Sequence, residues 1–252
     1  MKKVLFSAVF ALFASTQAFA IIGAGAHYVM NMGSSLKANK GEVSIDGVNT
    51  GIMINQESAS GLQGLGFKLW IDILPVIDIE GTLNIAATRY TTSLEIPGIY
   101  VDTLRYTPEA PYNMIFDRAD PIYGLFTGDL SITKPFDIIP VITPYIGAGI
   151  SYFASIPIVN KDFAEKVLDK ELVEALKSGS GDAENISESL SKSLQKAEYK
   201  TGIGGHAIAG LRLKLPVIPI AAYVNGKYYF GGNIDSQFSQ GFVLELGGGL
   251  AI

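Results

Sequence analysis

The stretch Phe242-Val-Leu-Glu-Leu-Gly-Gly-Gly-Leu-Ala-Ile252 alternates between two kinds of residue. Its even-numbered positions are apolar apart from one glycine, and its odd-numbered positions are small or polar apart from Val243. Successive side chains of a β-strand point to opposite faces, so this pattern predicts a strand with one apolar face. A soluble sheet packs such a face on a core, whereas a transmembrane barrel turns it toward lipid and turns the other face toward its lumen.

The first twenty residues are typical of a secretion signal. Lys2 and Lys3 precede an apolar run from Val4 to Ala14, and Ala18-Phe19-Ala20 provides a small-x-small cleavage site. Because the apolar run is short for a helix that crosses a bilayer, we expect residues 1–20 to be a cleaved signal and not an anchor. Cleavage changes the formal charge from −5 to −7, since two lysines leave with the signal.

Composition excludes several functions. The acidic balance argues against nucleic acid as a partner. The chain has no cysteine, which rules out disulfides, thiolate chemistry and cysteine-ligated metals. A mean hydropathy of +0.29 is high for a soluble protein with long polar loops.

Residues 138–159 carry no charge, yet their prolines and glycines argue against a membrane helix. The segment 143–152 has strand periodicity instead. Only helices and closed barrels satisfy every backbone polar group in hydrocarbon, so a non-helical membrane chain must close a barrel.

Strand alternation recurs along the chain. It is found in eight segments: residues 22–29, 64–73, 77–85, 126–133, 143–152, 203–215, 223–230 and 242–252. Eight such segments in an exported chain predict an all-β fold, a closed antiparallel transmembrane β-barrel of eight strands over residues 21–252. The competing expectation is a soluble periplasmic β-sandwich whose apolar faces pack together.

The connections between these segments alternate in length. Three are short and similar in sequence: Leu74-Pro-Val-Ile-Asp-Ile79, Ile139-Pro-Val-Ile-Thr-Pro144 and Leu215-Pro-Val-Ile-Pro-Ile220. The others are long and mostly polar: residues 34–63, 95–121, 159–199 and 233–240. Short turns on one side and long loops on the other are the outer-membrane arrangement, so we expect periplasmic turns, extracellular loops and both termini in the periplasm.

The third long loop has helical periodicity in residues 159–198. Apolar residues recur at helical spacing on both sides of Ser178-Gly-Ser-Gly181, which predicts two amphipathic helices. Asp162 with Glu165 predicts a capping box at the first helix. We expect the apolar faces of these helices to pack on each other or on the barrel mouth, or to bind a surface partner.

The end of the chain also carries a motif. Glu245-x-Gly247-x-x-Leu250-x-Ile252 is similar to the C-terminal assembly signal of outer-membrane barrels, although Ile252 stands where an aromatic residue is usual. By this motif and the strand pattern, the chain resembles the small eight-stranded barrels of diderm bacteria, the OmpW, OmpX and OmpA-barrel type. The resemblance implies a Gram-negative outer membrane, contact with its lipid, and recognition by the barrel insertion machinery.

Strand parity places charges of both signs in the expected lumen: Lys68, Asp72, Asp78, Glu80, Asp129, Arg212, Lys214, Lys227 and Glu245. An eight-stranded barrel is just wide enough inside for side chains, and an unpaired buried charge is very costly. We therefore expect these groups to pair and plug the lumen, with Asp129 near Arg212. The alternative is a narrow path for ions or small solutes.

His27 and His206 also have inward parity and raise the possibility of a lipid-modifying enzyme. Such an enzyme needs a nucleophile and a base within hydrogen-bond reach, and the chain has no Gly-x-Ser-x-Gly motif. The spacing of the two histidines matches no known metal motif. We expect two hydrogen-bonded lumen histidines, no catalytic, cofactor-binding or metal-binding residues, and a structural or surface-interaction role.

Overall fold

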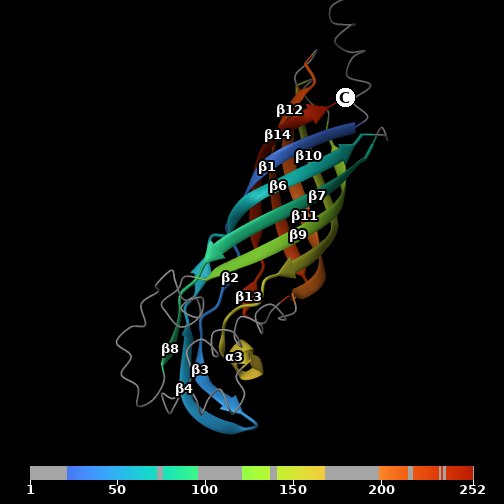
Figure 1. Ribbon diagram of the computed structural model, residues 1–252. Helices are drawn as coiled ribbons and strands as arrows, with labels where there is room; N and C mark the ends of the chain where they lie inside the picture. Colours follow the sequence, from blue (N-terminus) through green and yellow to red (C-terminus); the bar gives the residue numbers. More distant parts are fainter. Residues whose placement is uncertain are drawn as a thin grey trace, which may run out of the picture.

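A computed structural model places the described residues in a closed barrel with an extension at one end (Figure 1). The structure describes residues 22–72, 76–95, 121–136, 141–167, 199–214, 218–232, 234 and 237–251. The expected signal, parts of all three short turns, most of the third long loop and Ile252 lie outside these residues. No helix in the described part of the chain is long and apolar enough to cross a membrane.

Eight antiparallel strands form the barrel. They are β1 (Ile22–Asn31), β6 (Gln63–Ile71), β7 (Asp78–Arg89), β9 (Ile122–Pro135), β10 (Ile142–Ser155), β11 (Lys200–Lys214), β12 (Ile220–Gly231) and β14 (Phe242–Ala251). Strands that follow one another along the chain are neighbours, and β14 closes the barrel on β1 with Leu250 opposite Ala24. The predicted fold class is therefore confirmed, and each alternating segment contributes one strand.

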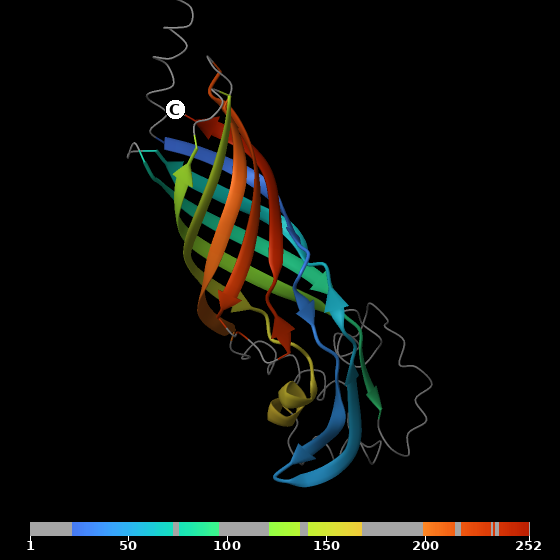
Figure 2. The ribbon, with the colours of Figure 1, turned by 180° about the vertical axis from the view of Figure 1, so that it is seen from behind.

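The barrel has two unlike ends (Figures 1 and 2). At the turn end the strands are joined by the three short connections, β1 begins and β14 ends. At the loop end the strands run into the long connections and the extension.

Side-chain parity separates the two surfaces of the barrel wall. Leu65 is 70% exposed on the outside, whereas Lys68 on the same strand is fully buried inside. Exposed apolar side chains form a belt around the outside: Ile22, Leu65, Phe67, Leu69, Ile79, Leu83, Ile85, Leu130, Ile132, Ile146, Ile150, Ile203, Leu211, Ile220, Val224, Leu246 and Leu250. Monomeric soluble proteins rarely expose apolar surface of this extent, so the belt requires an apolar environment.

The lumen is narrow enough that glycine is required where a large ring crosses it. Trp70 on β6 is fully buried and lies against Gly23 on β1. A Cβ atom at Gly23 would lie 1.9 Å from the Trp70 ring, which no real contact permits. Position 23 is therefore a glycine because the indole of Trp70, on the neighbouring strand, occupies the space that a side chain would need.

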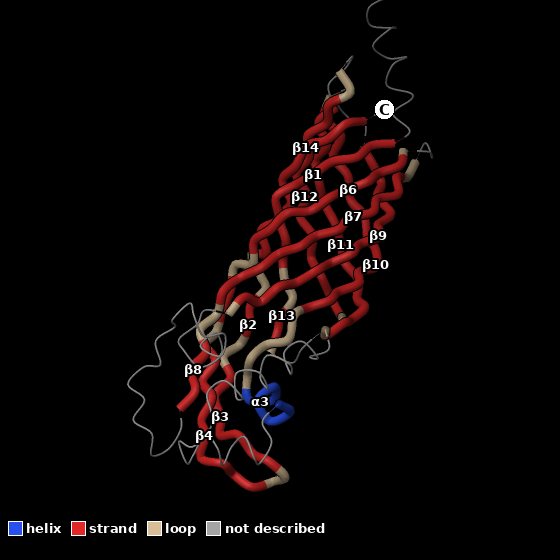
Figure 3. The backbone as a smooth tube through the Cα atoms, viewed as in Figure 1, coloured by secondary structure: helices blue, strands red, loops and turns tan. Residues whose placement is uncertain are grey.

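The extension is built mainly from the first long connection. It contains β3 (Asn39–Ile45) and β4 (Val48–Gln56), with β8 (Thr92–Glu95) paired on β4 and α3 (Lys161–Val167) packed on β3. Asp46 and Gly47 turn the β3–β4 hairpin with φ angles of 50° and 77°, as a two-residue turn with two left-handed residues requires. Val43 and Ile52 are fully buried inside this unit, which stands beyond the barrel mouth (Figure 3). The strand periodicity used for the barrel did not reveal this hairpin.

A second small sheet lies at the loop end of the barrel. It consists of three two-residue strands, in the order β13 (Phe238–Ser239), β2 (Ser35–Leu36) and β5 (Ala59–Ser60). Phe238 is opposite Leu36, and both side chains are buried. The first and the fourth long connections thus pair at the loop end.

The described helix in the third long loop is confirmed, but its cap differs from the expected one. Asn160 accepts a hydrogen bond from the Phe163 backbone N–H at 2.9 Å and is the N-cap. Glu165 does not fold back onto Asp162; it accepts the Ser44 N–H of β3 at 2.9 Å. Contact with a strand edge therefore replaces the predicted capping box. The second predicted helix lies outside the described residues.

Candidate functional site

The candidate site is the interior of the barrel. Seven of the nine charged residues expected there are buried, with no more than 6% of their surface exposed. Asp72 and Lys214, at the turn end, keep 15% and 34% of their side-chain surface exposed. Every one of the nine makes an ion pair, and the pairs form two clusters along the lumen.

The first cluster surrounds Arg212 near the turn end. Its Nη1 atom lies 3.2 Å from Asp72 Oδ1 and 3.2 Å from Asp78 Oδ2. Its Nη2 atom donates to Glu80 Oε1 at 2.5 Å. Lys214 Nζ donates to the second oxygen of Asp72 at 2.6 Å. One guanidinium thus joins three carboxylates from β7 and the β6–β7 connection, a use to which its fixed fork of donors is suited.

Aromatic rings line this cluster. Lys68 Nζ lies 2.6 Å from Glu80 Oε2 and 5.0 Å from the centroids of both the Tyr145 and Tyr223 rings. Arg212 Cζ lies 5.1 Å from the Trp70 ring. Cation–π contacts of this kind are strongest where water is excluded, so the rings both fill space and stabilise the cations.

The second cluster surrounds Lys227 further along the lumen. Its Nζ atom lies 2.8 Å from Asp129 Oδ2 and 2.7 Å from Glu245 Oε1. Tyr229 OH also donates to Asp129 Oδ2 at 2.8 Å. Asp129, expected beside Arg212, therefore lies with Lys227 instead. Strand parity correctly predicted that Asp129 faces the lumen. Its position along the barrel axis depends on the stagger of the strands, which the sequence does not specify.

Neutral side chains connect the two clusters. Lys68 Nζ donates to Tyr145 OH at 3.0 Å, and Tyr145 OH donates to Asn225 Oδ1. Asn225 Nδ2 in turn donates to Glu245 Oε2 at 2.9 Å. We call the nine charged residues with Tyr145 and Asn225 the lumen network. The two neutral members were not among the candidates from sequence, although both stand at inward positions of their strands.

Both ring nitrogens of His27 lie within hydrogen-bond distance of a polar side chain. Nδ1 lies 3.0 Å from Tyr223 OH and Nε2 lies 2.7 Å from Asn84 Oδ1. Asn84 Nδ2 then donates to Glu245 Oε1 at 2.9 Å. The ring is 3% exposed, so it acts as a structural hydrogen-bonding group that joins the wall to the lumen network.

His206 lies between two serines. Nε2 is 2.8 Å from Ser131 Oγ and Nδ1 is 2.8 Å from Ser151 Oγ, with Asp129 Oδ1 3.9 Å away. A nucleophilic serine needs a base and an accessible substrate, yet the two serines and His206 are all at most 1% exposed. Within the described residues, no group of three or more metal-ligating side chains is arranged to hold an ion.

Buried apolar side chains form a cluster at the loop end, beyond the lumen network. The cluster consists of Val29, Leu36, Leu62, Ala86, Tyr90, Tyr123, Leu125, Phe153, Ile158, Tyr229, Ile234, Phe238 and Val243. Phe238 stacks against Tyr123 with ring centroids 5.3 Å apart, and Phe153 meets Tyr229 edge to face. We call this group the apolar cap.

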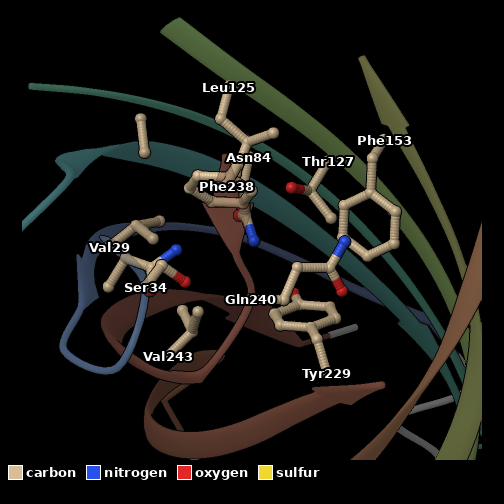
Figure 4. A pocket seen from close by; sticks show the side chains of 12 residues that line it. Val29, Ser34, Asn84, Leu125, Thr127, Phe153, Tyr229, Phe238, Gln240 and Val243 are labelled. Atoms are coloured by element: carbon tan, nitrogen blue, oxygen red, sulfur yellow. The ribbon is translucent and has the colours of Figure 1, made fainter. Parts of the chain in front are cut away.

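A small cavity lies beside the apolar cap (Figure 4). Its walls include Phe238 of β13, Gln240 just after that strand, and Asn84 and Thr127 of the barrel. Its volume is about 10 Å3, about the smallest that holds one water molecule.

The residues of the C-terminal motif divide between the two surfaces. Glu245 is fully buried in the lumen, and Leu250 is 55% exposed in the belt. A Cβ atom at Gly247 would meet His27 and Tyr223, so Gly247 faces the lumen. Ile252 lies outside the described residues.

The closed strand order, the apolar belt and the polar interior together define a transmembrane β-barrel of the outer-membrane type. This is the class that the sequence predicts. No protein-family model matches the chain, and no curated protein matches its sequence.

Two solved structures are similar to this chain. One is Ail, the attachment invasion locus protein of Yersinia pestis, in complex with the heparin analogue sucrose octasulfate; it is 10% identical with a TM-score of 0.44, over 92% of this chain and 97% of that one. The other is the outer membrane protein OprG from Pseudomonas aeruginosa; it is 10% identical with a TM-score of 0.40, over 93% of this chain and 99% of that one.

Because Arg212 makes several buried ion pairs, we expect a substitution at this inward position to reduce the free energy of unfolding much more than one at an outward position. Arg212→Ala leaves three carboxylates without their shared cation, and removing one partner of a buried pair typically costs about 3–5 kcal/mol. Leu211→Ala changes a neighbouring position that is 50% exposed on the belt and should cost much less. Urea unfolding of both variants in lipid vesicles measures the difference, and equal midpoints would contradict it.

Proposed function

We propose that the protein is a non-conducting outer-membrane barrel that anchors a folded extension at the cell surface, where the extension binds a partner. The observation that carries this proposal is the chain of buried ion pairs and hydrogen bonds in the lumen network, with the apolar cap beyond it at the loop end. A pore needs a continuous water path, and the cavity beside the cap, of about 10 Å3, has room for about one water molecule.

The lumen network resists opening for an electrostatic reason. Lys227 is fully buried and pairs with both Asp129 and Glu245. Moving it aside would leave two buried carboxylates facing each other without a cation, which costs several kcal/mol. Thermal motion of single side chains therefore does not open a water path through the lumen, and the barrel serves as a rigid membrane anchor for the extension.

The extension is fixed to the barrel by contacts between different loops. Val159 N donates to Tyr90 OH at 2.8 Å, and Thr92 Oγ1 donates to Val159 O at 3.4 Å. Burial raises the pKa of Tyr90 to about 12, so the phenol stays neutral at physiological pH. A rigid base suits a surface that must be presented to a partner.

In this arrangement the turn end and both termini face the periplasm, and the extension with the rest of residues 159–198 faces outward. The exposed tips of the extension then offer polar contact residues: Asp46, Asn49 and Glu57 are exposed on its hairpin and flank. The role is structural and interactive, and it requires no chemical step.

Planar-bilayer recording tests whether the lumen is closed. We expect the purified, refolded protein to give no stable conductance steps, because ion passage would have to break buried pairs. A refolded general porin serves as the positive control. Large, stable steps that persist after deletion of residues 39–56 would show that the barrel conducts.

Epitope accessibility tests the orientation. We expect a tag inserted between Asp46 and Gly47 to bind antibody on intact cells, since this turn is exposed at the tip of the extension. The same tag beside Val76, which is 58% exposed at the turn end, should bind only after the outer membrane is permeabilised. The reverse pattern would contradict the orientation.

A further inference from the structure

Aromatic side chains cover some of the glycines on the outer face of the barrel. A Cβ atom at Gly205 would lie 2.5 Å from the ring of Phe230, and one at Gly226 would lie 2.8 Å from the ring of Phe242. In each case a ring from the neighbouring strand lies over the bare backbone, a device that shields strand glycines. These rings cover the backbone at Gly205 on β11 and Gly226 on β12.

Two other outward glycines have no such cover. A Cβ atom at Gly81 would meet nothing within 4 Å, and one at Gly128 would make only ordinary contacts, the nearest with Leu83 at 3.5 Å. Gly81 on β7 is opposite Leu130, and Gly128 on β9 is opposite Leu83. The two glycines thus lie diagonally across neighbouring strands and form one uncovered depression.

Large apolar side chains surround this depression and turn it into a groove. The walls are formed by Phe67, Leu69, Leu83, Leu130, Ile150 and Tyr152. The groove has a volume of about 430 Å3, which lies within the range of sites that bind small molecules. Each wall residue belongs to a strand of the barrel, so the groove is part of the rigid wall.

The position of the groove identifies what surrounds it. On β7 the exposed residues Ile79 and Ile85 lie on either side of Gly81, and on β9 Ile132 continues the belt toward the turn end. The groove therefore lies within the apolar belt and opens into the hydrocarbon of the bilayer. An empty groove would forfeit dispersion contacts along its whole lining.

We propose that this groove binds one acyl chain of a membrane lipid, held longer than the lipids around the rest of the barrel. A flexible hydrocarbon chain matches an apolar lining that offers no polar anchor along its length. Tyr152 stands at the groove wall nearest the loop end of β10 and is 46% exposed, and tyrosines at such positions place a polar tip toward the headgroups. This inference rests on the transmembrane class and is independent of whether the lumen conducts.

Native mass spectrometry of the whole protein tests the groove. The protein is refolded in micelles that contain a phosphatidylglycerol with two long acyl chains, and the lipid adducts that survive collisional activation are counted. Gly81→Leu with Gly128→Leu places side chains in open space and fills the groove. The matched control is Ala222→Leu, an exposed alanine on β12 outside the groove. Heat-modifiable gel mobility verifies that every variant is folded.

We expect the native protein and Ala222→Leu to retain one lipid under conditions that strip the rest. Retention by the filled variant should fall about tenfold, as when about two buried methylene groups lose their contacts. The headgroup alone, glycerophosphoglycerol, should not be retained. Equal retention by the filled variant would overturn the proposal, and so would a native dimer that the filling substitutions convert to a monomer.

Discussion

Closing eight strands into a barrel leaves a lumen only as wide as the side chains that fill it, and the rest of the structure depends on this constraint. In an interior this narrow, a buried charge is costly unless it has a partner among its neighbours. Arg212 and Lys227 each pair with more than one carboxylate, and Tyr145 and Asn225 connect their clusters. The apolar cap lies at the loop end, where the first and the fourth long connections pair.

The sequence was sufficient to predict the barrel because each spanning strand has a periodicity of two and a two-sided environment. Apolar residues are required on the face toward lipid and small or polar residues on the face toward the lumen, so the alternation persists along the whole strand. The β3–β4 hairpin was missed even though Asp46-Gly47 is a strong turn signal between alternating apolar residues. Its strands pack on a local core, and the two-residue strands β2, β5 and β13 are too short for any periodicity.

The candidate site could be predicted only in part. Strand parity identified which charges face inward, because the face of a residue follows from its position along the strand. It did not identify partners, since these depend on strand tilt and stagger: Asp129 lies with Lys227 and not with Arg212. The predicted capping box was wrong for a similar reason, because Glu165 accepts a hydrogen bond from Ser44, which is distant in sequence. Contacts across the barrel are properties of the closed structure.

A double-mutant cycle between Lys227 and Asp129 tests most directly whether buried pairing holds the barrel together. The free energy of unfolding is measured in lipid vesicles for the native protein, Lys227→Met, Asp129→Asn and the double variant. We expect the double variant to be more stable than the sum of the single effects by at least about 1 kcal/mol, within the range for residues in direct contact. Additivity within about 0.5 kcal/mol, the range for independent sites, would contradict the account.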